Sequence, residues 1–265
     1  MAGTAERRET VVAEMPQVRK ITFDEVQAAL AQGVKDFMTV PAFGFVLGGL
    51  YALGGLAILS SIFYFQLTYL AYPLLAGFVL IGPFVAAGLY EVSRELEEGR
   101  TPTWSGVIAA AYAQHKREMA WMAFISIFAM IIWLYQVRLL LALFLGFASY
   151  ASFDDFVRVL FTTTDGISFL IVGHIVGAVL AIVMFSLTVI SFPLLMDRDV
   201  DVVTAMITSV KSVILSPLPM LGWGLVVVFF LFIGCVPAFL LLPITLPVLG
   251  HTTWHLYRRA VIPPA

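Results

Sequence analysis

Two histidines near the C-terminus have the spacing that a helix needs to place both rings on one face. His251 and His255 stand at positions i and i+4, and residues four apart are neighbours on a helix surface. Neutral imidazoles so placed could bind a metal ion, or one could ligate haem with His174 as partner. Alternatively, both histidines sit in an aromatic interface belt with Trp254 and Tyr257. We expect His174 toward the outer side of a membrane and His251 toward the inner side, which disfavours a shared haem.

Three aspartates at alternate positions form a second candidate site. Asp197, Asp199 and Asp201 surround Arg198, and three carboxylates this close together could hold a divalent cation. The alternative, which we favour, is that Asp199 or Asp201 caps the following helix, because the N-terminal end of a helix dipole attracts negative charge. We therefore predict no metal at this position.

Two further polar residues interrupt apolar stretches. His174 is ionisable and lies at membrane depth, which makes it a functional candidate, although a hydrogen bond between helices also accounts for it. Arg138 follows Met119 by about 20 residues, the length of one membrane crossing, so we expect its side chain to extend outward to the surface. The alternative is a tilted helix that buries Arg138 beside an acidic partner, which could be Asp154, Asp155 or Asp165.

The rest of the sequence carries no pattern that points to catalysis. It has no glycine-rich phosphate loop, no Gly-x-Ser-x-Gly, no HExxH and no second cysteine to pair with Cys235, and these are the usual signatures of enzymes with known chemistry. The net charge of −2 gives no reason to expect a nucleic-acid partner. We therefore expect a protein that is not an enzyme and that needs no cofactor.

Composition requires a lipid solvent for the elements that carry these residues. Hydrophobic residues make up 61% of the chain and charged residues 12%, against about 45–50% and about 25% in soluble domains. Uncharged runs long enough to cross a bilayer predict an all-α, polytopic protein with six transmembrane helices, near 41–63, 69–91, 119–146, 168–194, 217–236 and 238–256. The alternative for residues 217–256 is one long kinked helix, which puts the C-terminus on the opposite side.

The lysines and arginines favour six spans and set their orientation, because these residues stay on the cytoplasmic side of membrane proteins. With six spans, all of them except Arg138 and Arg158 lie on one side, whereas five spans move Arg258 and Arg259 across. We therefore predict that both termini are cytoplasmic. The residues predicted at the cytoplasmic membrane interface are Lys35, Lys116, Arg117, Lys211, Trp254, Tyr257, Arg258 and Arg259.

Three amphipathic stretches resemble one another and indicate an internal repeat. Superimposed without gaps, they place Val26, Ala29, Leu30, Val34 and Lys35 on Val107, Ala110, Ala111, His115 and Lys116, and again on Val202, Ala205, Met206, Val210 and Lys211. Each stretch leads into an odd-numbered span, and the even spans carry Pro83, Pro193 and Pro247 before their inner ends. The alternative is that cytoplasmic connections between spans are often amphipathic and basic.

The repeat predicts a single membrane domain over residues 21–262, after a disordered cytoplasmic tail at 1–20. Its three units cover about 22–91, 103–194 and 199–257, and each consists of an amphipathic helix followed by a transmembrane hairpin. Such a helix lies in the interface, with its apolar face in the lipid and its lysine among the headgroups. The helix of the middle unit is expected over 103–118.

Two stretches carry a resemblance to a known family. They are SFPLLMDRDVDVVTAMITSVKSVILSP, at Ser191–Pro217, and PVLGHTTWHLYRRAV, at Pro247–Val261. Together with the six-span pattern, they resemble the bacterial integral membrane proteins of domain of unknown function 2189, over roughly residues 20–262. The resemblance implies a bacterial cytoplasmic membrane, and it brings no activity, cofactor or catalytic residue to carry over.

The function that fits these expectations is that of a non-enzymatic integral membrane protein of the bacterial inner membrane. It is an assembly, scaffold or envelope-homeostasis component, whose partners are the lipid bilayer and another membrane protein or complex. The alternative is a small-molecule or lipid transporter, although transporters usually carry carboxylates or broken helices at the midplane. A third possibility, a haem- or metal-binding subunit of a redox complex, rests on the histidines alone.

Overall fold

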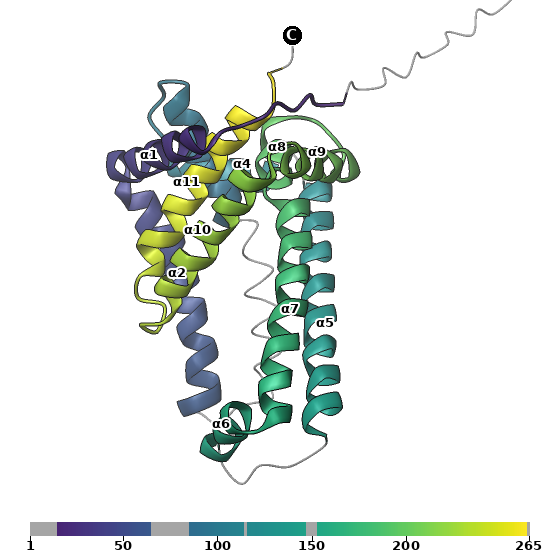
Figure 1. The fold of residues 1–265 in the computed structure, drawn as a ribbon. Coiled ribbons are helices and arrows are strands. Elements are labelled where there is room, and N and C mark those ends of the chain that lie inside the picture. The colour runs from purple at the N-terminus through teal and green to yellow at the C-terminus, as the bar shows by residue number, and fades with distance from the viewer. Residues whose placement is uncertain (1–14, 65–84, 114–115, 147–152, 264–265) are drawn as a thin grey trace, which may run out of the picture.

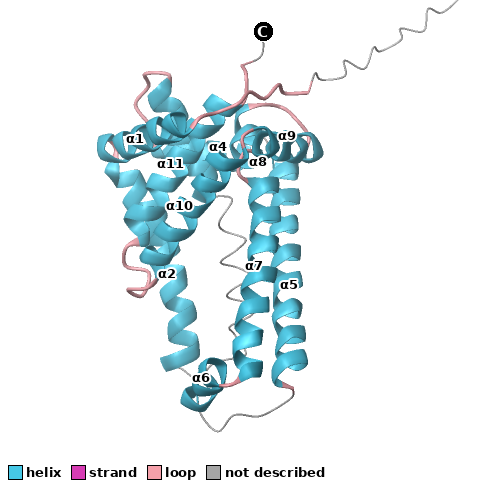
Figure 2. Cartoon of the chain, in the orientation of Figure 1, coloured by secondary structure: helices cyan, strands magenta, loops and turns pink. Residues whose placement is uncertain are grey.

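The computed structural model describes residues 15–64, 85–113, 116–146 and 153–263. Within these residues every regular element is a helix (Figure 2), which confirms the all-α prediction. The helices are α1 (Phe23–Thr39), α2 (Pro41–Leu59), a π-helical turn (Ser60–Tyr64), a helix at 85–97, α4 (Trp104–Ala113), α5 (Lys116–Leu145), α6 (Phe153–Thr162), α7 (Thr164–Thr188), α8 (Ser191–Asp197), α9 (Val202–Leu215), α10 (Pro217–Cys235) and α11 (Leu242–Ala260).

Four helical segments of the described chain are long and apolar enough to cross a membrane. They are Pro41–Leu59, Glu118–Leu145, Thr164–Asp197 and Pro217–Cys235. The long helices α5 and α7 pack side by side, and α1, α8 and α9 lie across one end of the bundle (Figure 1). That end, which also holds the last turns of α11, is called the α1 end here, and the opposite end, where α6 lies, is called the α6 end.

The amphipathic helix expected at the start of the first unit forms as α1, over Phe23–Thr39. Thr22 begins it with a capping box, in which its hydroxyl accepts from the Glu25 N–H and the Glu25 carboxylate accepts from the Thr22 N–H. Ahead of this cap, residues 17–19, which belong to the tail predicted to be disordered, form backbone hydrogen bonds with residues 260–262. The Arg19 N–H donates to the Ala260 carbonyl at 2.9 Å, and Val18 pairs with Val261. Residues 1–14 lie outside the described residues.

Two of the predicted amphipathic helices join their spans through the same backbone conformation. Val40 has φ −135° and ψ 62° before Pro41, and Ser216 has φ −135° and ψ 61° before Pro217. A residue before proline avoids the helical region, and proline itself is well suited to the first turn of a new helix. The chain therefore ends one helix and starts the next at both junctions, and the two prolines are equivalent when Val26 is superimposed on Val202.

The middle amphipathic stretch is helical over the residues that the structure describes. Thr103 caps α4, because its hydroxyl accepts from the Gly106 N–H at 3.1 Å, and helix is described over Trp104–Ala113 and again from Lys116. Residues 114–115, and with them the continuity of the helix expected over 103–118, lie outside the described residues. His115 lies outside the described residues, and nothing is described of the side chains of Lys116 and Arg117.

The segment at 217–256 forms two separate helices, α10 and α11, and of these two only α10 is among the candidate membrane spans. After α10, the backbone of Ala238 and Phe239 takes positive φ values of 50° and 65°, and α11 then returns to the α1 end (Figure 1). One kinked helix over 217–256 is therefore excluded. A side chain at Gly234 would touch Thr245 and Leu242, so the absence of one lets the start of α11 pack closely on the end of α10.

Candidate functional site

The C-terminal half of α11 is the most enclosed polar segment in the described chain. His251 and Thr252 are fully buried, and Leu256 and Tyr257 are equally enclosed. The enclosure follows from small residues on the neighbouring helices, because Gly33 of α1 lies directly against the backbone of Thr252. The segment is surrounded by α1, the helix at 85–97 and α8, which supply its polar partners.

The two histidines singled out by their spacing are brought together, through a carboxylate that the sequence did not connect with them. His255 Nε2 lies 2.7 Å from Asp36 Oδ2, and the Ser93 hydroxyl donates to the same oxygen at 2.8 Å. Ser93 Oγ is also 2.8 Å from His251 Nδ1. These four residues, called the Asp36 cluster here, join α1, the helix at 85–97 and α11.

The protons of the Asp36 cluster can be assigned from its geometry. A serine has a single proton, and Ser93 places it on the Asp36 carboxylate. His251 Nδ1, 2.8 Å from Ser93 Oγ, can then only donate to that oxygen. His251 Nε2 is buried.

A second group of contacts lies on the adjacent face of α11, and we call it the Arg258 cluster. Glu97 accepts from Trp254 Nε1 and from Arg258 Nε, both at 3.1 Å. Asp197 accepts from the Tyr257 hydroxyl at 2.5 Å and from Arg258 Nη1 at 3.3 Å. The Arg258 guanidinium lies 5.9 Å from the centre of the Trp254 ring, within the range of a cation–π contact.

The structure places inside the protein the two aromatic residues that were predicted at the membrane interface. Trp254 is 1% exposed and Tyr257 0% exposed, so neither ring can face lipid headgroups. The polar atom of a tryptophan or tyrosine can form its hydrogen bond equally well at a membrane interface or beside a buried carboxylate. Arg258 and Arg259 also have partners within the chain, since Arg258 donates to Glu97 and Arg259 donates to Gln32 Oε1 at 2.8 Å.

The three aspartates do not gather into one site. Asp197 belongs to the Arg258 cluster, whereas Asp201 caps α9 by accepting from the N–H groups of Val203 and Thr204 at 2.9 and 3.0 Å. The hydrogen bond from the Thr204 hydroxyl, together with these N–H groups, lowers the pKa of the Asp201 carboxyl. Within the described residues, no three His, Cys, Asp or Glu side chains are arranged to hold a metal ion. The carboxylate of Asp201 therefore acts as a helix cap.

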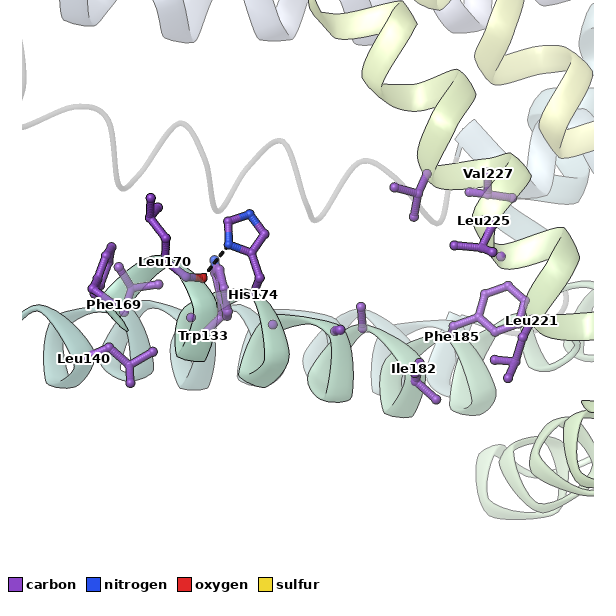
Figure 3. A pocket seen from close by; sticks show the side chains of 17 residues that line it. Trp133, Leu140, Phe169, Leu170, His174, Ile182, Phe185, Leu221, Leu225 and Val227 are labelled. Atoms are coloured by element: carbon purple, nitrogen blue, oxygen red, sulfur yellow. Dashed lines mark hydrogen bonds between the residues drawn. The ribbon is translucent and has the colours of Figure 1, made fainter. Parts of the chain in front are cut away.

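His174 is far from the Asp36 cluster along the bundle. It is an exposed residue of α7, in the half of that helix nearer the α6 end, and its Nδ1 lies 2.6 Å from the Leu170 carbonyl (Figure 3). It lines a groove of about 910 Å³ between α5, α7 and α10, whose other walls include Trp133, Phe169 and Phe185. A haem shared by His174 and His251 does not fit this separation.

Arg138 lies on an uninterrupted helix. α5 runs from Lys116 to Leu145, and the Arg138 side chain is exposed. In the described part of the chain Arg138 forms no hydrogen bond or ion pair, and Asp155 instead accepts from Arg158 at 2.8 Å. The apolar stretch after Arg138 continues the same helix to Leu145, so the arginine lies on the outside of the bundle.

Several residues of the site carry no signal that sequence reasoning could have used. Ser93 and Glu97 lie in a polar connection like many others, and only the structure shows that they face α11. Asp36 had a weaker signal, because it is the last charge before the long uncharged run that starts at Phe37. A charge at that position is expected to stay in water, and here it is paired inside the protein instead.

These features define the class: a helical integral membrane protein, with several apolar helices and a buried polar network at one end. A family model, DUF2189, described as a predicted integral membrane protein, matches residues 71–197, just under half of the chain. The resemblance to this family is thereby confirmed over that region, which includes Ser191–Asp197 but does not reach Pro247–Val261. No curated protein and no solved structure matches the chain.

Proposed function

We propose that this protein is a non-enzymatic scaffold of the bacterial cytoplasmic membrane, with six spans and both termini in the cytoplasm. The spans form three units, of about 22–91, 103–194 and 199–257, within one membrane domain over residues 21–262. Each unit presents an amphipathic helix to the cytoplasmic leaflet before its hairpin enters the membrane. The family match supports the membrane location, and the bacterial location is what the sequence resemblance implies.

Two observations support the repeat. The Val40–Pro41 and Ser216–Pro217 junctions share their position in the superposition and their backbone angles. Ala29 and Ala205, which the same superposition pairs, are both fully buried at the face where α1 and α9 pack on the bundle. Equal burial at equal positions is what a repeated packing interaction produces, and the third equivalent residue, Ala110, is partly buried.

The orientation is supported by where the described cations lie. Arg19, Lys20 and Lys35 belong to the N-terminal segment and α1, and the cations of α9 and α11 lie at the same end of the bundle. The exceptions, Arg138 and Arg158, lie on the distal part of α5 and on α6. Cytoplasmic lysine and arginine therefore correspond to the α1 end.

The observation that carries the scaffold proposal is the closed polar network at the α1 end. A serine hydrolase needs an accessible serine and an aspartate that orients the histidine through its other ring nitrogen. Here Ser93 and His251 are both fully buried, and Asp36 contacts Ser93 and His255 rather than His251. The polar groups are thus arranged to hold four segments of the chain in register, which is a structural task.

A transporter of lipids or small apolar molecules is the second candidate, and the groove between α5, α7 and α10 favours it. Its lining residues are apolar apart from His174, which suits an acyl chain better than a polar solute. The redox candidate is weaker, because His174 and His251 lie apart and His255 is already bound to Asp36.

The proposal predicts a stable complex with another membrane protein. Purified gently from its native membrane, the intact protein should elute with a second membrane protein at fixed stoichiometry. Asp36→Ala should release that partner, because the cytoplasmic ends of α1 and α11 then separate. The preparation should show no Soret band and less than one metal ion per ten chains.

The contradicting result is equally definite. The scaffold proposal is contradicted if the protein elutes alone and also moves lipid or solute across the membrane of proteoliposomes. That pair of results favours the transporter. A Soret band at one haem per chain replaces it with the redox subunit. Asp24→Ala is the matched control, because it removes an exposed carboxylate from the same helix.

A further inference from the structure

Arginines and lysines at the α1 end are used differently. The arginines have partners within the protein: Arg94 pairs with Glu91 through two hydrogen bonds of 2.8 and 2.7 Å, and Arg198 donates to the Ile262 carbonyl at 2.7 Å. Within the described residues, the side chains of Lys20, Lys35 and Lys211 have no hydrogen-bond or ion-pair partner. A lysine is a flexible point charge that suits an external anion, so these lysines are the cations left for a ligand outside the chain.

Two of the three lysines line the same pocket. Lys20 and Lys211 line a pocket of about 460 Å³ whose other walls are Val18, Ile214 and Leu215. Two cations beside three aliphatic side chains form an amphipathic site, which suits a ligand that has an anionic group attached to a hydrocarbon.

The pocket is held in shape by backbone contacts on both sides. The Ile21 N–H donates to Ser216 Oγ at 2.9 Å, in a buried bond that fixes the segment next to Lys20 against the end of α9. On its other side, the same segment pairs with the C-terminus through the Arg19 N–H and the Ala260 carbonyl, at 2.9 Å. Binding therefore requires little ordering of the backbone, because these bonds already place the two lysine-bearing segments together.

The pocket also lies next to the start of a candidate membrane span. Lys211 is in the last turns of α9, and the candidate span begins at Pro217, directly after the pocket. Ile214 is 73% exposed and Leu218 is 71% exposed, so an apolar path leads from the pocket toward the hydrocarbon region. Exposed leucine and isoleucine are ordinary in a membrane span. Here they follow two unpaired lysines, which could bind the headgroup of a lipid whose acyl chains lie along the apolar path.

We propose that this pocket binds one anionic phospholipid, whose phosphate lies between Lys20 and Lys211 and whose acyl chains follow Ile214 and Leu218. The site rests on the proposed function in one respect, since the proposed orientation places it in the cytoplasmic leaflet. The proposal specifies the class of lipid that the scaffold recognises. It also gives the extended segment at 17–21 a function, which is to position Lys20 beside Lys211. Each lysine contributes about fivefold to the affinity, as basic residues do at anionic membrane surfaces.

The test is a lipid titration of the full chain in mild detergent, with bound lipids counted by native mass spectrometry. Phosphatidylglycerol should bind at one tight site, and phosphatidylcholine at least tenfold more weakly. Lys20→Ala and Lys211→Ala should each weaken phosphatidylglycerol binding about fivefold, and the double variant about 30-fold. Lys35→Ala is the matched control, because it removes an unpaired lysine outside the pocket, and it should leave the affinity unchanged.

Three results would overturn the proposal. The first is a double variant that keeps its helical circular dichroism and elution volume and binds phosphatidylglycerol as tightly as the unaltered protein. The second is an equal loss in Lys35→Ala, which assigns the effect to general charge. The third is displacement of the lipid by millimolar inorganic phosphate, which makes the ligand a free anion. The measurement in detergent does not depend on orientation or on a partner protein, so its failure is distinct from failure of the scaffold proposal.

Discussion

Replacing Gly33 with valine should lower the free energy of unfolding by about 3 kcal/mol, the upper part of the range for forcing extra atoms into a packed interior. A Cβ atom at Gly33 would lie 2.6 Å from the Thr252 backbone nitrogen and 2.9 Å from its Cα. Because these are backbone atoms of a helix, they cannot rotate away as the end of a side chain can. The variant must therefore separate α1 from α11, and the Asp36 cluster opens with it.

The measurement is detergent-solubilised unfolding, followed by circular dichroism during a titration with denaturing detergent. Gly49→Val is the matched control, since a Cβ at Gly49 has no neighbouring atom within 4 Å and the substitution carries the same change in backbone freedom. Equal stability of the two variants would show that α1 and α11 are not in contact. That result would also remove the basis for the Asp36 cluster.

Replacing Asp36 with alanine should cost about 2–4 kcal/mol. The carboxylate accepts from Ser93 and from His255 at 2.8 and 2.7 Å, and its side chain is 13% exposed. Removing one member of a buried, charge-assisted network leaves its partners without hydrogen bonds in a poorly solvated place. The loss is smaller than for a fully buried ion pair because some water reaches the carboxylate.

Two companion variants make this result specific. Asp36→Asn keeps an acceptor oxygen and should recover part of the loss, whereas Asp24→Ala, on the exposed side of the same helix, should cost less than about 1 kcal/mol. The same unfolding assay applies. If Asp36→Ala were no more harmful than Asp24→Ala, the four-residue cluster would not contribute to stability.

The helices were predictable because they depend on local properties of the chain. Two local features locate the start of α2 to within a residue. They are the absence of charge from Phe37 to Tyr90 and the proline at position 41. Asp201 was predictable as a helix cap for the same reason. A capping side chain accepts hydrogen bonds from N–H groups of the next three residues, so it needs no distant partner. None of these features needs information from a distant part of the sequence.

The partners of the buried polar residues were not predictable, because they depend on which helices become neighbours. Asp36 and His255 are 219 residues apart, and the sequence shows only an aspartate at one helix end and a histidine near another. Trp254 and Tyr257 show the same limit, because their composition fits a lipid interface and a protein interior equally well. Their burial beside Glu97 and Asp197 follows from the packing of α11 against the helix at 85–97 and α8.

The central claim is that the chain crosses the membrane six times and keeps both termini in the cytoplasm. Its most direct test is the accessibility of single cysteines in intact cells, after the exposed Cys235 has been changed to serine. The variants are Ala2→Cys and Ala265→Cys at the termini and Asp154→Cys on α6. A membrane-impermeant maleimide should label Asp154→Cys in intact cells and should label the terminal cysteines only after the membrane is opened. Labelling of Ala265→Cys in intact cells, with Ala2→Cys protected, would contradict six spans and the third repeat.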